Sequence, residues 1–316
     1  MNKPEYLLRR LGVAAITLLL ITFVVFFVIQ LPPGDYVDSL VANRAAEGEV
    51  VTEQQIIEMK HDYGMDRPFI VRGTSFYYHE NVLIKIKETL GVTMVLSLST
   101  MLFTYLVSIP IAIYSAKHQY SVGDYLFTFI GFVGMAVPHF LFALLLMYAS
   151  LRIWGKPIMG LPEVSITSWK TFMEWVKSFI IPVIVIGTSG TCSLIRTIRG
   201  QMLDEMGQPY VLCIRSKGVK ESTITYKYLM WAVLNPIVSG LGNMISSIFN
   251  GSTITAIVLM MPTLGPILLK ALQTQDIYLS GGILLISAFL VVIGNLISDI
   301  LLSVLDPRIK LEEEDS

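Results

Sequence analysis

Long stretches without a charged side chain divide this chain, and they constrain its fold more than any other feature. The uncharged runs are Leu11–Gln30, Thr89–Ala116, Tyr125–Leu151, Ser178–Ile195, Tyr228–Leu269 and Ile277–Ser298. A helix of about 20 apolar residues crosses the hydrocarbon core of a bilayer. Only 15% of the 316 residues are charged, whereas soluble domains average about 25%. The runs therefore favour membrane spans over the alternative, a soluble protein with buried helices.

We predict an all-α polytopic membrane protein with six transmembrane helices. The expected spans cover residues 11–30, 89–116, 125–151, 178–198, 232–259 and 277–305. The run Tyr228–Leu269 has 42 residues, which is too long for one span. Pro262, Gly265 and Pro266 are expected to break it, so residues 260–276 are predicted to form a loop.

The positive charges predict the orientation. Lys3, Arg9 and Arg10 precede the first span, and cytoplasmic segments carry an excess of Lys and Arg. That span exceeds a signal-peptide core of about 7–15 residues and is expected to remain uncleaved. Both termini are then cytoplasmic. The predicted cytoplasmic segments are 1–10, 199–231 and 306–316, and the predicted extracytoplasmic segments are 31–88, 152–177 and 260–276.

The segment 31–88, between the first two spans, has a soluble character. Thr52-Glu53-Gln54-Gln55 has the form of a capping box and predicts a short helix after Thr52. Gly64 is a candidate cap at the far end of that helix. A structural cap on the outer face is the preferred interpretation, and a binding site is the alternative.

Motifs for nucleotide or metal chemistry are missing from the sequence. The only Gly-Lys pair, Gly155-Lys156, is followed by proline, so there is no phosphate-binding loop. Cys192 and Cys213 have neither metal-site nor disulfide spacing. The chain is therefore expected to be no enzyme by itself and to hold no cofactor or metal. Energy for transport would come from another subunit or from an ion gradient.

Polar side chains within the uncharged runs are candidates for a solute pathway. His139 follows Pro138, where the third span should kink, and an ionisable group inside a span is a functional candidate by default. Asp299 is the other ionisable candidate for ion coupling. The neutral candidates are Ser239, Asn243, Ser246, Ser247 and Asn250. Close helix packing explains these small residues equally well, as it does the Gly187–Ser193 string.

A basic, part-apolar segment, Gly207–Pro236, separates two uncharged runs and is a candidate docking element. A short helix is predicted over Tyr210–Gly218 and should end at its glycine. That helix would present Val211, Ile214 and Arg215 to a groove of a partner.

The same segment carries a family resemblance. Tyr210-Val211 and Arg215-Ser216-Lys217-Gly218-Val219, followed by Leu234 and Pro236, resemble the cytoplasmic "EAA" loop of binding-protein-dependent ABC importer permeases, in particular the B-type permease of the oligopeptide/dipeptide/nickel group. Further landmarks follow in the right order from end to end: Arg9-Arg10, Leu31-Pro32-Pro33-Gly34-Asp35, Tyr63–Pro68 and Leu305–Ile309. Three departures stand out, namely Cys213 and Ile214 in place of alanines, Asn235 before Pro236, and a short stretch between Pro68 and Asn81.

The resemblance implies a permease subunit of an ATP-driven importer in a prokaryotic inner membrane. The implied solute is a peptide or another small polar solute such as nickel, glutathione, an opine or an oligosaccharide. The implied partners are a second homologous permease, two identical or homologous ATP-binding subunits that use ATP and Mg, an extracytoplasmic solute-binding protein and the lipid bilayer; a nucleic-acid partner is not expected. The implied ATPase-coupling residues are Tyr210, Val211, Ile214, Arg215, Ser216, Lys217, Gly218 and Val219. Two alternatives stay open, a stand-alone ion-coupled transporter and a non-transporting scaffold or sensor.

Overall fold

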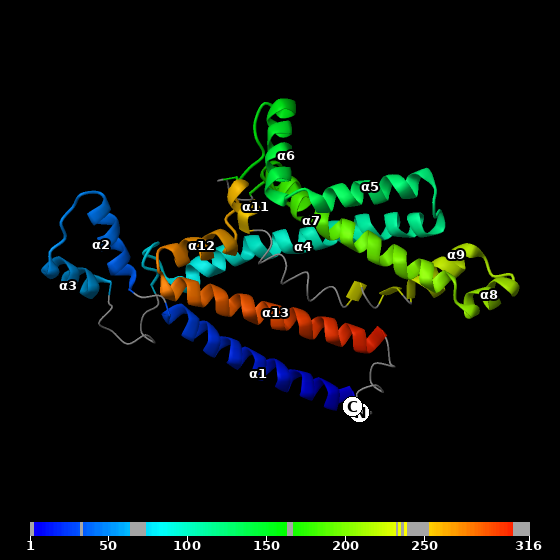
Figure 1. Cartoon of the computed structure of the whole chain (residues 1–316), viewed down its shortest axis with the longest axis horizontal. Helices are drawn as coiled ribbons and strands as arrows, with labels where there is room; N and C mark the ends of the chain where they lie inside the picture. Colours follow the sequence, from blue (N-terminus) through cyan, green and yellow to red (C-terminus); the bar gives the residue numbers. More distant parts are fainter. Residues whose placement is uncertain are drawn as a thin grey trace. The chain divides into compact units, whose positions relative to one another are not determined.

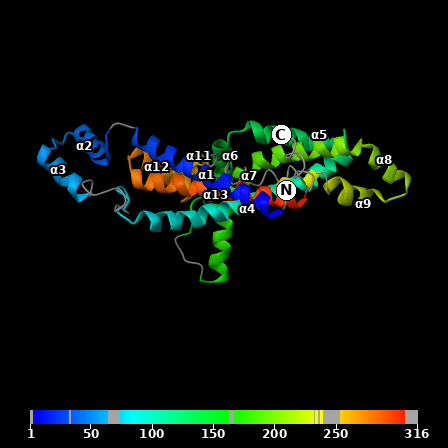
Figure 2. The same cartoon turned by 90° about the horizontal axis from the view of Figure 1, so that it is seen from below.

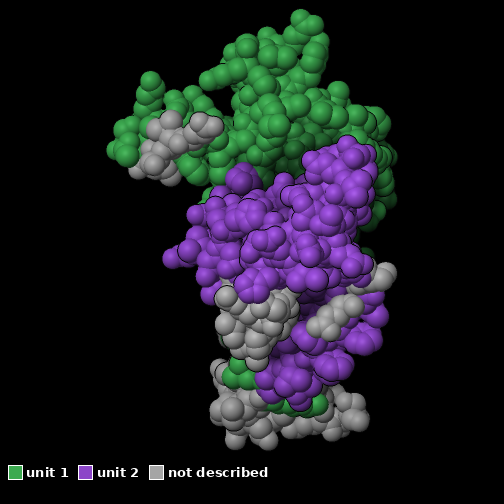
Figure 3. Space-filling view, turned by 90° about the vertical axis from the view of Figure 1, so that its left-hand side faces the viewer, with its two compact units in different colours: residues 1–11, 95–261, 291–316 green, residues 12–94, 262–290 purple. Residues whose placement is uncertain are grey.

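The computed structural model describes residues 3–31, 34–63, 74–162, 167–231, 233–234, 237–238 and 253–305. These residues form helices joined by turns (Figure 1), and among them strand pairing is limited to one bridge between Thr74 and Asn81. The all-α prediction is confirmed. The chain divides into two compact units, coloured separately in Figure 3: Met1–Leu11, Val95–Met261 and Val291–Ser316 form unit 1, and Gly12–Met94 and Pro262–Leu290 form unit 2.

Four of the described helices are long and apolar enough to cross a membrane. They are α1 (Lys3–Gln30), α4 (Val82–Lys117), α7 (Trp169–Met206) and α13 (Ile277–Leu305). Most of the expected span 232–259 lies outside the described residues, and its far end is a short helix, α11 (Thr253–Val258). The structure therefore supports a multi-pass membrane protein, and the count of six spans stays a prediction.

Two of these helices extend well beyond the predicted spans. α4 begins at Val82 although its span was expected from residue 89, and α7 covers 169–206 although 178–198 was expected. Charged residues mark where a span leaves the apolar layer, but a helix continues in water because its hydrogen bonds are internal. The start of α7 is fixed instead by a capping box between Ser168 and Thr171.

The third predicted span is broken rather than merely kinked. α5 (Val122–Ala136) and α6 (His139–Trp154) meet at an angle of 106°. Pro138 lacks a backbone N–H, and its ring pushes Val137 out of the helical region to φ −78° and ψ 123°. The pair therefore forms either one broken span or a re-entrant segment.

The predicted loop 260–276 contains a helix, α12 (Leu264–Gln273). Thr263 is the N-cap, so Gly265 and Pro266 lie in the first helical turn. N–H groups in the first turn have no partner within a helix, so a proline there removes nothing that the helix needs. The predicted break in the uncharged run is present, but it covers residues 259–263 and includes Pro262 alone of the three expected breakers; Gly265 and Pro266 belong to the next helix.

Unit 2 contains the two short helices α2 (Tyr36–Ala46) and α3 (Glu53–Asp62). The capping box predicted at Thr52 is confirmed, with Gln55 as its reciprocal partner. Gly64, the expected cap, lies outside the described residues. The Lys60 ammonium lies 2.8 Å from a carboxylate oxygen of Asp35 and 3.2 Å from one of Asp38. These pairs raise the pKa of Lys60 and fasten α3 to the start of α2.

Asp276 organises the rest of unit 2. Asp276 is fully buried. Its carboxylate accepts hydrogen bonds from the Ser75 hydroxyl at 2.5 Å and the Tyr77 N–H at 3.2 Å. It also accepts the Leu279 N–H at 3.1 Å, which caps α13. A buried carboxylate is stable only when such donors replace water. One side chain thereby ties the turn before α4 to the start of α13.

In unit 1, α5 lies alongside α7 in both Figure 1 and Figure 2. A Cβ atom placed on Gly134 of α5 would lie 2.9 Å from both Cys192 and Thr188 of α7. On another face of α7, Gly187 lies against Phe103 of α4, where a Cβ would come within 2.7 Å. The glycines of both helices therefore permit close helix packing, as predicted for the Gly187–Ser193 string.

This close approach gives a matched pair of substitutions. Gly134→Ala should destabilise the protein by about 1–3 kcal/mol, because the new methyl group overpacks the contact between α5 and α7. Gly131→Ala is the control, since its methyl group would lie 3.9 Å from Cys192, an ordinary contact. Thermal unfolding of the purified protein in detergent measures both. Equal unfolding midpoints for the two variants would contradict the tight packing.

Candidate functional site

The predicted surface helix exists and is α8 (Pro209–Ser216). Pro209 occupies the first turn, where its fixed φ angle favours a helix. Gly218 follows the helix with a φ of +72°, the left-handed region in which side chains other than glycine are strained. Its N–H bonds to the Arg215 carbonyl at 2.9 Å. The prediction that Gly218 ends the helix is confirmed.

The inner face of α8 is packed against the ends of two spans. Val211 is completely buried, and Ile214 packs against the same cluster from a half-buried position. The buried members of this cluster are Ala112, Ile113, Ala116, Ile198, Met202, Val211, Ile224, Leu229, Val233 and Ile237. Presentation of Val211 to a partner, as expected from the sequence, is therefore wrong, whereas contact of the half-buried Ile214 with a partner stays a prediction. Residues three apart share one helix face, and here that face supplies the packing that a short helix needs.

The outer face of α8 is the part that is free to meet a partner. Leu212 is 59% exposed although Val211 before it is completely buried, and Cys213 after it is exposed as well. Tyr210 is 39% exposed and donates its hydroxyl to Glu205 at 2.6 Å. Partial burial and this carboxylate raise the pKa of Tyr210. The remaining exposed residues of the segment are Ser216, Lys217 and Gly218.

An ion pair closes the turn after α8. Arg215 donates from Nε to one carboxylate oxygen of Glu221 at 2.7 Å and from Nη2 to the other at 3.3 Å. This two-point contact lowers the pKa of the Glu221 carboxyl and raises that of Arg215. Arg215, expected to face a partner, is thus engaged within the chain. Val219, also predicted for this site, is half-buried against the apolar cluster.

The chain continues from this turn through a π-helix. Glu221–Thr223 form the short helix α9, and Ile224–Leu229 form the π-helix η2. Ile224 and Leu229 are both fully buried in the cluster that receives α8. A π-helix adds a residue to a turn and occurs frequently at functional sites. The segments before and after the exposed turn are therefore both fixed to the same core.

The structure locates only one of the predicted pathway residues. His139, at the first position of α6, lies 2.8 Å from the Ser189 hydroxyl of α7 through its Nε2 atom. The other candidates, Ser239, Asn243, Ser246, Ser247 and Asn250, lie outside the described residues. Asp299, the second ionisable candidate, pairs with Arg10 at 3.1 Å. Ion coupling through Asp299 stays a prediction.

Two polar residues that the sequence reading missed form the most buried ion pair described. Asp124, at the start of α5, is 2% exposed and receives two hydrogen bonds from Arg199 of α7. The two residues are 75 positions apart, so the sequence gives no local indication that they form a pair. An Asp three positions after Ser121, a helix N-cap, was the available signal.

The described residues contain no group of three His, Cys, Asp or Glu side chains that would hold a metal ion. What they present is a surface helix with a buried inner face, an exposed apolar outer face and fixed ends, placed between membrane spans. The described residues are therefore those of a multi-pass membrane protein with a surface helix between its spans.

Comparison with known proteins identifies the family. Residues 108–311 match the family described as the binding-protein-dependent transport system inner membrane component, and residues 4–84 match the N-terminal part of such membrane components. The chain belongs to this family. It is a permease subunit of an ABC importer and a multi-pass protein of the inner membrane, as the resemblance implied.

Several curated relatives are similar along almost their whole length. The oligopeptide transport system permease protein AppB of Bacillus subtilis (strain 168) is 31% identical, covering 96% of this chain and 99% of the relative. The dipeptide transport system permease protein DppB of Lactococcus lactis subsp. cremoris (strain MG1363) is 26% identical, covering 97% and 99%. DppB of Escherichia coli (strain K12) is 24% identical, covering 97% and 98%.

Adjacent residues on α8 provide a test of its two faces. Val211→Ala should destabilise the permease by about 2 kcal/mol, because it removes buried methyl groups and leaves a cavity. Leu212→Ala removes a larger side chain but should leave stability unchanged, since that side chain is mostly exposed. Thermal unfolding of the purified permease in detergent compares them. A greater loss from Leu212→Ala would overturn the assignment of inner and outer faces.

Proposed function

We propose that this permease forms half of the pathway for peptides in an ATP-driven importer and that α8 couples it to the ATPase subunits. The names of the relatives support peptides as the solute class, since they are described as oligopeptide and dipeptide transport permeases. The observation that carries the coupling role is the exposed Leu212 on a helix that is fixed to the protein by the buried Val211 and the half-buried Ile214. An exposed apolar side chain on a fixed helix suits insertion into a partner's groove.

Membership of the importer family supports the partners in this proposal. Two ATP-binding subunits, identical or homologous, bind and hydrolyse ATP with Mg. A second homologous permease completes the pathway. A solute-binding protein on the outer side delivers the peptide.

The orientation belongs to the same proposal. Six spans, with the fifth over 232–259, place both termini and α8 in the cytoplasm, where the ATPase subunits have access. The basic residues around α8 support this side. The α2–α3 segment and the loop after α6 then face outward, toward the solute-binding protein.

Transport proceeds in this proposal by a shift between two conformations. Closure of the ATPase subunits moves α8, and the spans packed on α8 move with it between inward-open and outward-open states. His139 lies beside the break between α5 and α6, where these two helices can change their angle. It stays a candidate pathway residue with Ser239, Asn243, Ser246, Ser247 and Asn250. A peptide with charged ends suits a pathway lined by neutral hydrogen-bonding groups.

The solute class is tested with the assembled transporter. The permease, its partner permease, the ATPase subunits and the binding protein are reconstituted in proteoliposomes, and ATP hydrolysis is measured with candidate solutes. Di- and oligopeptides should raise the ATPase rate and accumulate inside. If nickel or an oligosaccharide raised the ATPase rate and peptides did not, peptides would be ruled out as the solute.

Substitutions at Gly218 test the coupling role. Gly218→Val should abolish most uptake, because a β-branched residue does not tolerate the φ of +72°. Gly218→Asp should also lose uptake, because it places a negative charge on a basic docking surface. Gly218→Asn is the matched control, since Asn tolerates this backbone region better than most residues and adds no charge.

All three variants are compared by uptake per inserted permease and by capture of the ATPase subunits. The proposal expects Val and Asp variants that insert normally but neither take up peptide nor hold the ATPases firmly. Normal uptake in both of them would show that α8 is not the coupling element.

A further inference from the structure

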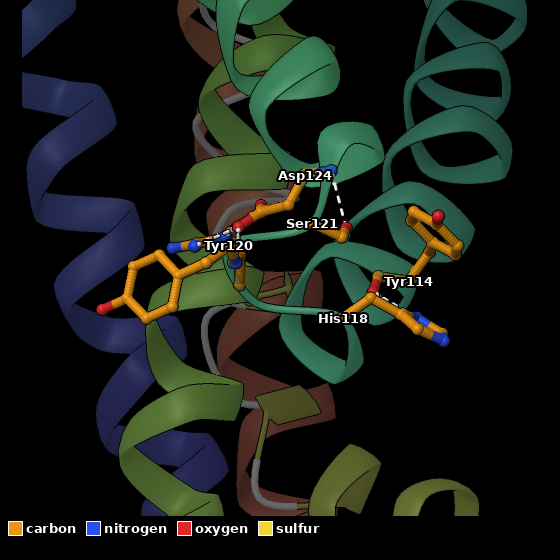
Figure 4. A network of polar contacts seen from close by, with 6 residues as sticks. Tyr114, His118, Tyr120, Ser121 and Asp124 are labelled. Carbon is orange, nitrogen blue, oxygen red and sulfur yellow. Dashed lines mark hydrogen bonds and ion pairs between the residues drawn. The ribbon is translucent and has the colours of Figure 1, made fainter.

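The ion pair between Asp124 and Arg199 carries an inference beyond the docking helix. Figure 4 shows Asp124 at the start of α5, beside Tyr120 and Ser121 of the turn that follows α4. Arg199 donates from Nε at 2.8 Å to one carboxylate oxygen and from Nη2 at 2.7 Å to the other. The Tyr120 N–H adds a third hydrogen bond at 3.0 Å.

Net stability is a poor explanation for this pair. Removing two charges from water costs several kcal/mol per ion, and well-packed apolar residues of similar volume are often as stabilising or more so. A planar guanidinium that binds both oxygens of a carboxylate does fix geometry in a way that apolar contacts do not. What the pair supplies is a defined position of the start of α5 relative to α7.

The turn that presents Asp124 is itself tightly constrained. Tyr120 has a φ of +63°, and the Ser121 hydroxyl caps α5 by accepting the Asp124 N–H at 3.2 Å. Gly123 lies so close to Tyr114 that a Cβ atom would come within 2.6 Å of the tyrosine hydroxyl. Asp124 is therefore held from its own side as well as by Arg199, and the turn is too compact to absorb a relative movement.

The other end of the pair leads directly to α8. Arg199 follows Ile198, which is fully buried in the same apolar cluster as Val211 of α8. Further along, α5 and α7 remain in close contact at Gly134. An unbroken series of buried contacts thus runs from α8 through the end of α7 into α5, and α5 stops at Val137, where the helix breaks.

We propose that Asp124 and Arg199 are a positioning pair that makes α5 move with α8. When α8 is displaced, the end of α7 carries Arg199, and the ion pair carries the start of α5. Helices α8 and α5 and the end of α7 would then move together. The first place where the chain can bend is the break before Pro138, next to the contact between His139 and Ser189. This inference rests on the proposed coupling role of α8. It adds that the movement of α8 passes next to α5, through the ion pair.

The test uses the assembled transporter in proteoliposomes and measures peptide taken up per ATP hydrolysed. Asp124→Asn keeps the shape of the side chain and removes its charge, and Arg199→Gln removes the partner charge. Each should lower uptake per ATP by about 2- to 30-fold while ATP hydrolysis continues. The double variant should be no worse than either single variant, because both remove the same interaction.

Two controls separate positioning from helix stability and from charge. Ser168→Ala removes the N-cap of α7 but leaves the ion pair and the turn that presents Asp124. Arg196→Gln removes an exposed positive charge from α7, three residues before Arg199. Both should keep the normal ratio of uptake to hydrolysis. Arg199→Lys, which keeps the charge but loses the two-point contact, should fall between Arg199→Gln and the unmodified protein.

A distance measurement gives a readout that reduced stability alone would not change. Spin labels are attached to a cysteine replacing Lys220, which is exposed after α8 and outside its docking face, and to a cysteine replacing Val122, which is 86% exposed at the start of α5. Cys192 and Cys213 are replaced by Ser so that they take no label. The distance between labels should be the same in the nucleotide-free and vanadate-trapped transporter. In the Asp124→Asn background it should differ between these two states.

The outcomes distinguish this inference from the proposed function. Loss of uptake in Gly218→Val together with an unchanged uptake-to-hydrolysis ratio in Asp124→Asn and Arg199→Gln would overturn the positioning pair alone. Additive losses in the double variant, or a constant label distance in Asp124→Asn, would also overturn it. Normal uptake in the Gly218 variants would instead remove the coupling role on which the inference rests.

Discussion

Val211 has no exposed surface because α8 lies against the ends of α4 and α7, and this burial fixes a helix of only eight residues on the membrane spans. An isolated helix of that length would be marginal in water. Its inner face therefore supplies its stability, and its outer face is left for a partner. The close approach of α5 and α7 at Gly134 extends the same body away from α8. In the proposed mechanism these buried contacts transmit the movement of α8 to α5.

Buried carboxylates recur where the chain changes direction. Asp276 caps α13 and binds the turn at Ser75, and Asp124 binds Arg199 from the start of α5. Both lie at helix N-termini, where backbone N–H groups and the helix dipole stabilise negative charge. The additional donors to Asp276 are neutral, whereas Asp124 also binds the guanidinium of Arg199. Each carboxylate holds together elements that are distant in sequence.

Proline acts in two different ways at three positions of the described chain, and its place relative to a helix decides which. Pro209 and Pro266 lie in first turns and are compatible with helix formation, whereas Pro138 separates two helices at 106°. The sequence reading treated Pro266 as a breaker and missed α12. It anticipated a bend at Pro138 but not its size, because the angle depends on which contacts hold α6 after the backbone bond is lost.

The sequence by itself determined the all-helical membrane class, the capping box at Thr52, the end of α8 at Gly218 and the family. These depend on local chemistry, namely uncharged length, caps, a glycine in the left-handed region and an ordered set of motifs. Only the tertiary structure decided that Val211 faces inward and that Asp124 meets Arg199. Burial and ion pairing are set by which helices pack together, and residues separated by 75 positions carry no local signal of their contact. The helix α8 was therefore predictable from the sequence, but which of its side chains are buried and which are exposed was not.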